Sequence, residues 1–169
     1  VFDWRSVPGE KSKLAQEFEG KPASGHTLKS EEFSLINSGM VGLQMTIHGE
    51  KSKKFSTNFR GLGLAGGNFE QVDGGESLHI QFDKDVIVES VALVAGKGVC
   101  GGFYQMGKAA PLAIYCVDAD NDAKTQEGII SDLGVLRAGQ TLKLDSSPHY
   151  GVETAGQWRL GAISVRILK

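Results

Sequence analysis

The chain has little excess charge and no long apolar run. Its 18 lysines and arginines are balanced by 20 aspartates and glutamates, so the formal net charge is −2. A nucleic-acid-binding domain usually carries a basic surface that holds phosphates, and this balance therefore predicts no nucleic-acid partner. No segment approaches the ~20 consecutive apolar residues of a membrane-spanning helix, so we also predict no insertion into a membrane.

Cysteine and histidine are scarce, and neither is spaced for metal binding or redox chemistry. The two cysteines, Cys100 and Cys116, match neither a zinc ribbon nor a Cys-x-x-Cys motif, and the sequence leaves open whether they pair. The four histidines include no His-x-His or His-x-x-x-His pair of the kind that binds zinc.

Motifs of catalysis are missing as well. There is no Gly-x-Ser-x-Gly elbow, and residues 61–66 match Gly-x-Gly-x-x-Gly without the βαβ unit that a dinucleotide site needs. We therefore predict that the protein is not an enzyme. A weaker alternative is a polysaccharide hydrolase, in which two carboxylates pair across a substrate, or a lyase that uses His149 and Tyr150.

Glycine is abundant, with 23 residues against four prolines, and alternating apolar segments recur between turn residues. This pattern is typical of an all-β protein. We predict a single domain over residues 1–169, folded as a two-sheet antiparallel β-sandwich of the jelly-roll type. A short helix is predicted over residues 10–20, and strands are predicted at residues 32–36, 41–48, 77–82, 86–95, 112–118, 129–136, 140–144 and 158–168.

A glycine-rich acidic loop precedes the predicted strand at 77–82 and offers a candidate metal site. Glu70, Asp73 and Glu76 lie in this loop, and two glycines separate Asp73 from Glu76. Calcium takes six to eight oxygen ligands, and glycines allow backbone carbonyls to turn inward beside carboxylates. The loop therefore predicts a Ca²⁺ site, with an ordinary acidic turn at Asp73-Gly74 as the alternative.

A second acidic run, Asp118 to Asp122, alternates acids as an EF-hand loop does at its start. The EF-hand is excluded because Ala123 and Ile129 stand where it needs glycine and glutamate. A solvated hairpin is the favoured interpretation of this run.

Two loops carry aromatic residues beside polar ones, as sugar sites do. Tyr104 and Gln105 lie in the first, and His149 and Tyr150 lie in the second. These four residues are the predicted ligand-binding residues, with capping of the sandwich end as their alternative role. Core capping is the favoured role for Phe103.

The stretch 61–82, the following Val86 and the terminal strand 158–167 resemble a β-sandwich region of exported bacterial proteins of the PEP-CTERM sorting class. The positions that carry the resemblance are Gly61, Leu62, Gly63, Asp73, Glu76, Leu78, Phe82 and Val86. The resemblance implies export, a jelly-roll or galactose-binding-like sandwich, and extracellular recognition or matrix roles.

Together these observations predict a secreted or cell-surface carbohydrate-binding module, without catalysis and with a structural calcium ion. Its expected partner is a polysaccharide or other glycan, with neighbouring domains of a larger secreted protein as further contacts. The alternative is a structural or adhesive extracellular module of a bacterial surface protein that binds no small ligand.

Overall fold

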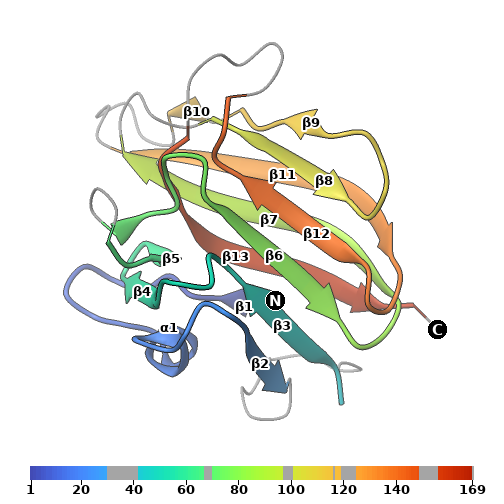
Figure 1. Ribbon diagram of the computed structural model, residues 1–169, viewed down its shortest axis with the longest axis horizontal. Coiled ribbons are helices and arrows are strands. Elements are labelled where there is room, and N and C mark those ends of the chain that lie inside the picture. The colour runs from blue at the N-terminus through green and yellow to red at the C-terminus, as the bar shows by residue number, and fades with distance from the viewer. Residues whose placement is uncertain are drawn as a thin grey trace.

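Two antiparallel sheets stacked face to face form the protein (Figure 1). The computed structural model describes residues 1–29, 42–66, 70–96, 101–115, 117–118, 125–148 and 156–168. Its elements are β1 (Phe2–Asp3), α1 (Lys13–Phe18), β2 (His26–Lys29), β3 (Gln44–His48), β4 (Phe55–Asn58), β5 (Gly61–Leu64), β6 (Ser77–Phe82), β7 (Val86–Gly96), β8 (Phe103–Met106), β9 (Leu112–Ala113), β10 (Val117–Asp118), β11 (Thr125–Leu136), β12 (Thr141–Asp145) and β13 (Trp158–Ile167).

The chain passes repeatedly from one sheet to the other. One sheet has the order β2-β3-β6-β12-β8-β9, and the other has the order β10-β11-β7-β13-β5-β4, with β1 also paired to β13. Consecutive strands such as β6 and β7, or β12 and β13, therefore lie in different layers. This arrangement confirms the predicted all-β, two-sheet antiparallel sandwich.

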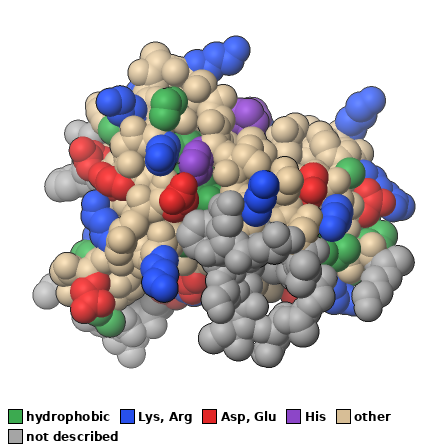
Figure 2. Space-filling model, turned by 90° about the horizontal axis from the view of Figure 1, so that it is seen from below, with side chains coloured by type: hydrophobic (Ala, Val, Ile, Leu, Met, Phe, Trp, Pro, Cys, Tyr) green, Lys and Arg blue, Asp and Glu red, His purple; other side chains and the backbone are tan. Residues whose placement is uncertain are grey.

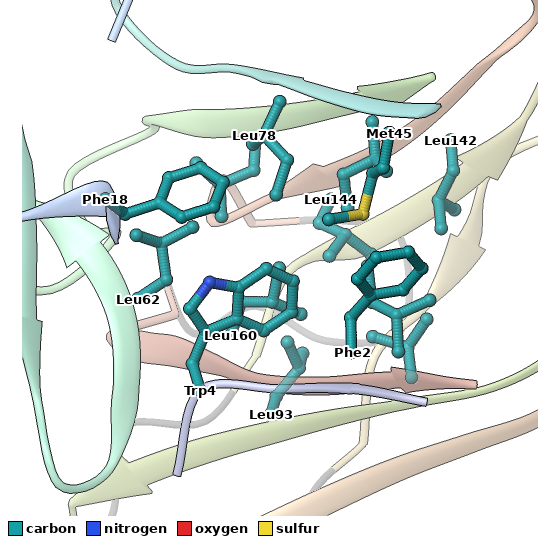
Figure 3. Close-up of a cluster of buried hydrophobic side chains, with 14 of the residues drawn as sticks. Phe2, Trp4, Phe18, Met45, Leu62, Leu78, Leu93, Leu142, Leu144 and Leu160 are labelled. Atoms are coloured by element: carbon teal, nitrogen blue, oxygen red, sulfur yellow. The ribbon is translucent and has the colours of Figure 1, made fainter. Parts of the chain in front are cut away.

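Alternating side chains build the core between the layers. In β6 the side chains of Leu78, Ile80 and Phe82 are buried, whereas the intervening ones are partly exposed. Figure 3 shows apolar side chains of both sheets meeting around Phe2 and Trp4, with Phe18 of α1 beside them. Trp4 and Trp158 are fully buried.

The helix α1 closes the sandwich beside β4 (Figure 1). Ser12 begins it, because its hydroxyl accepts a hydrogen bond from the Ala15 amide at 3.0 Å. Phe18 then packs edge-to-face on Trp4 and Phe55, with ring centres 5.8 and 5.2 Å apart. The predicted helix exists and is shorter than expected. Within the described residues, no helix has the length and apolar character to cross a membrane.

Most predicted strands are confirmed within a few residues, and one is wrong. The single strand expected over residues 112–118 is two short strands, β9 and β10, which belong to different sheets. The strand expected over 32–36 lies outside the described residues. β1, β2, β4, β5 and β8 are absent from the sequence-based expectation, since each has at most four residues.

The start of the glycine-rich stretch is the strand β5 rather than a loop. Leu62 and Leu64 are buried in the core, so Gly61 and Gly63 face the other side of the sheet. A Cβ at Gly63 would overlap the carbonyl oxygen of Glu70, because the following loop packs directly on this strand. Glycine is thus required here for close packing.

Candidate functional site

The outer face of the six-stranded sheet carries a continuous set of polar side chains. Each of its central strands buries every second residue, so the remaining residues point away from the core. In Figure 1 this sheet lies toward the viewer, with β6 and β12 in front of β7 and β13. We name this surface the polar face; it consists of Gln44, Thr46, His48, Ser77, His79, Gln81, Phe103, Gln105, Thr141, Lys143 and Asp145.

One row of the polar face runs straight across four strands. In the register of the sheet, His48 of β3 is opposite His79 of β6, His79 is opposite Lys143 of β12, and Lys143 is opposite Gln105 of β8. Neighbouring strands are about 4.8 Å apart, so the row extends over about 14 Å. It therefore aligns two imidazole rings, an ammonium group and an amide on one face of the sheet.

The two histidines of this row are held by hydrogen bonds at their edges. His48 Nδ1 lies 2.9 Å from the carbonyl oxygen of Ser24, so it carries the proton of that bond. His79 Nε2 lies 2.9 Å from Ser77 Oγ. Burial lowers the pKa of His79, and the neighbouring Lys143 and His48 lower it further.

Lys143 joins the row to an aromatic ring. Its ammonium lies 5.1 Å from the centre of the Phe103 ring and 2.8 Å from Asp145 Oδ2. Gln105, two residues from Phe103 on the same strand, donates from Nε2 to the Ala109 carbonyl oxygen at 2.9 Å. An aromatic ring, a cation and an amide thus lie together on one sheet surface, and the carboxylate that pairs with the cation is nearly buried, since Asp145 is 5% exposed.

A second row beside the first carries hydroxyl and amide groups. Thr46 Oγ1 lies 2.7 Å from Thr27 Oγ1 on β2. Gln81 follows in register, and its Nε2 donates to Thr141 Oγ1 at 2.9 Å and to the Gly139 carbonyl oxygen at 3.1 Å. These groups can donate and accept hydrogen bonds as sugar hydroxyls require.

The predicted ligand-binding residues divide between the two faces of β8. Gln105 lies on the polar face, as a ligand-binding residue would. Tyr104 points inward and packs against the core, whereas its neighbour Phe103 points outward under Lys143. Tyr104 was expected to bind the ligand and Phe103 to cap the core, and the structure reverses these positions. Strand alternation allows only one of two adjacent residues to face solvent. His149 and Tyr150 lie outside the described residues.

Glu70 is separated by its contacts from the other two predicted metal ligands. Its Oε2 accepts a hydrogen bond from Ser56 Oγ at 2.6 Å, and its charge stabilises the guanidinium of Arg159. Arg159 is 2% exposed, and burial lowers its pKa to about 10, although Glu70 and Glu19 oppose this shift. Glu70 thus acts as a counter-ion for a buried arginine.

Asp73 and Glu76 do lie together, at the turn that precedes β6. The Asp73 amide donates to Glu76 Oε2 at 3.2 Å, and the Glu76 amide donates to the Asp73 carbonyl oxygen at 2.9 Å. The Glu76 carboxylate also pairs with the ammonium of Lys53. Asp73 Oδ2 is buried without a hydrogen-bond partner. In the part of the chain that the structure describes, no three acidic, histidine or cysteine side chains form a group that could hold a metal.

Two further groups singled out in the sequence, the cysteines and most of the acidic run 118–122, are not covered by the structure. Both cysteines and the acids beyond Asp118 in the run 118–122 lie outside the described residues. The functional candidates that sequence reasoning missed are His48, His79 and Lys143, and Phe103 was assigned to core capping. Alternation within each strand predicts that His79 and Lys143 face outward, but only the register between strands brings them side by side.

Comparisons of the chain with protein-family models, with curated proteins and with solved structures found no match in any of the three.

Proposed function

We propose that the protein is a carbohydrate-binding module without catalytic activity and that the polar face receives the glycan. One observation carries this proposal: the Phe103 ring shares the outer surface of the sheet with Lys143 and Gln105. An aromatic ring packs against the apolar side of a sugar ring, while amide and charged groups bond its hydroxyls. The second row, with the hydroxyl and amide groups of Thr46, Gln81 and Thr141, extends the same surface.

Affinity electrophoresis through gels that contain soluble polysaccharides tests the proposal. We expect one or more plant, algal or bacterial glycans to retard the protein relative to a gel without polysaccharide. Retardation by none of a broad panel would contradict carbohydrate binding. Release of reducing or unsaturated sugar by the purified protein would instead support a hydrolase or lyase.

A structural calcium ion is a second part of the proposal, with Asp73 and Glu76 as ligands. The buried Asp73 Oδ2, which has no hydrogen-bond partner, supports it. The ammonium of Lys53 on Glu76 weighs against it, because a cation already neutralises that carboxylate. Thermal unfolding in the presence of calcium and in the presence of chelator tests whether the protein binds the ion. Calcium at ~100 times its dissociation constant would add about 2.7 kcal/mol to the free energy of unfolding, and equal melting temperatures would exclude the ion.

Secretion or display at a cell surface belongs to the proposal through the resemblance to exported bacterial proteins. Detection of the protein in culture medium or on intact cells of its source, with antibody, tests this part. A purely intracellular distribution would contradict it.

A structural or adhesive module is the second candidate, and exposed apolar residues on the other sheet favour it. Ile129 and Val135 of β11 are 64% and 45% exposed. Among the described strands, β10 pairs only with Gln126 and Glu127, which leaves most of one edge of β11 open. A neighbouring domain would pack there, and replacing Ile129 with serine would weaken that contact without changing glycan retention.

A further inference from the structure

The row formed by His48, His79 and Lys143 places three basic groups next to one another. His48 and His79 are directly opposite across β3 and β6, and His79 and Lys143 are directly opposite across β6 and β12. Opposed side chains in an antiparallel sheet have Cβ atoms about 5 Å apart, and like charges at this distance destabilise the sheet. A bound anion would offset the repulsion between a protonated His79 and Lys143.

Among the described residues, one carboxylate, that of Asp145, balances the charge of the row. The charged and titratable groups facing His79 are His48 from β3 and Lys143 and Asp145 from β12, while β6 itself contributes the neutral Ser77 and Gln81. Asp145 is engaged by Lys143 at 2.8 Å and by the Ser147 amide at 2.8 Å. The charges of Lys143 and Asp145 therefore nearly cancel, and protonation of His79 adds a positive charge to the row.

On the face seen in Figure 2, acidic and basic side chains are interspersed, as expected from a net charge of −2. The length of the row, about 14 Å from strand spacing, suits several consecutive sugars of an extended chain better than a single small anion.

We infer that the glycan bound by the polar face is an acidic polysaccharide whose carboxylates are received by His48, His79 and Lys143, and that binding strengthens as the pH falls. This inference rests on the proposed carbohydrate-binding function and specifies its ligand class. The Phe103 ring and Gln105, adjacent to Lys143, contact the uncharged parts of the same chain.

The direction of the pH effect follows from proton linkage. In the free protein, burial and the neighbouring basic groups keep the pKa of His79 below its usual value, so His79 is neutral at pH 7.5. A bound carboxylate stabilises the protonated ring and raises this pKa. Each unit by which the pKa rises strengthens binding by up to about tenfold at low pH, and the gain disappears as pH rises above the pKa of the complex.

Isothermal titration calorimetry with oligogalacturonate, and with neutral cello- and malto-oligosaccharides of the same length, tests the inference at pH 5.5 and 7.5. We expect oligogalacturonate to bind several-fold more tightly at pH 5.5 and to do so with net proton uptake, measured in buffers of different ionisation enthalpy. His79→Gln and Lys143→Gln should both bind oligogalacturonate more weakly than the wild type. His79→Gln should also lose most of the pH dependence and proton uptake.

Lys21→Gln is the matched control, because it removes one positive charge from an exposed residue that is not part of the polar face. Thermal unfolding of each variant checks that it folds; if His79→Gln does not fold, His48→Gln carries the same test.

Binding of a neutral oligosaccharide without pH dependence would overturn the acidic-ligand inference and leave the proposed function intact. Equal weakening by Lys21→Gln would indicate diffuse electrostatic attraction and overturn the assignment to the row. Binding of no glycan of the panel would overturn both.

Discussion

The guanidinium of Arg159 donates from Nη1 to the carbonyl oxygen of Ser56 at 3.1 Å, on the outer side of the seven-stranded sheet. The same nitrogen donates to the Gly61 carbonyl oxygen at 3.3 Å. The loop that carries Glu70 packs over this side of the sheet at Gly63 and leaves Arg159 2% exposed. A loop with the composition of a metal site therefore also serves to cover and neutralise a buried cation.

Replacing Arg159 with methionine should lower the free energy of unfolding by about 2 to 4 kcal/mol, because two buried carbonyl oxygens lose their donor. Urea unfolding measures the change. Arg60→Met is the control, since Arg60 is only half-buried and its guanidinium lies 5.2 Å from the Phe59 ring centre. A loss no larger than that of Arg60→Met would mean that the buried guanidinium contributes little.

Replacing Phe103 with alanine should weaken glycan binding by about tenfold or more, because it removes the aromatic surface of the polar face. Affinity electrophoresis with the retarding polysaccharide measures the loss. Tyr104→Phe is the control, since this ring packs on the core side of the same strand. If Tyr104→Phe abolished retention and Phe103→Ala preserved it, the glycan would bind elsewhere.

Stability should decline below about pH 4, in part through Asp145, because an aspartate in an unfolded chain has a pKa of about 3.9. Burial opposes ionisation of Asp145, but hydrogen bonds from Lys143 and Ser147 outweigh it and hold its pKa below the usual value. A lowered pKa contributes stability above the unfolded-state pKa, and this contribution is lost as the pH falls through the folded-state value.

Urea unfolding of the wild type and of Asp145→Asn between pH 3 and 6 measures this contribution. The variant should be less stable at pH 6, and the difference should shrink as the pH falls toward 3. A difference that stays constant over this range would contradict the electrostatic role of Asp145.

Replacing Gly63 with alanine should lower the free energy of unfolding by about 3 kcal/mol, because the added Cβ collides with the Glu70 backbone. Gly66→Ala is the control: its φ of +99° is strained for alanine, but its Cβ would meet no atom within 4 Å. We expect Gly66→Ala to lower the free energy of unfolding by about 1 kcal/mol, from backbone strain alone. Equal losses in urea unfolding would show that close packing of the loop on β5 is unimportant.

The alternation of apolar and polar residues along each strand was enough to predict the layered β architecture. In the strand Ser77–Phe82, apolar and polar residues alternate without interruption, and the structure has the strand with these bounds. The long strands β7 and β13 follow from the same rule, because a half-buried strand needs an apolar side chain at every second position. β4 and β5 do not follow from it, since close packing rather than apolar pattern holds Gly61 and Gly63 in the sheet.

The order of residues along the chain is sufficient to predict two antiparallel sheets and the outward orientation of His79 and Gln81. It does not predict which outward residues become neighbours. His48, His79 and Lys143 come from three separate parts of the chain, and only the pairing register of β3, β6 and β12 aligns them. The same holds for Glu70, which meets Ser56 and Arg159 rather than Glu76. Alternation is a property of each strand, whereas register and loop packing depend on the cooperative fit of the whole core.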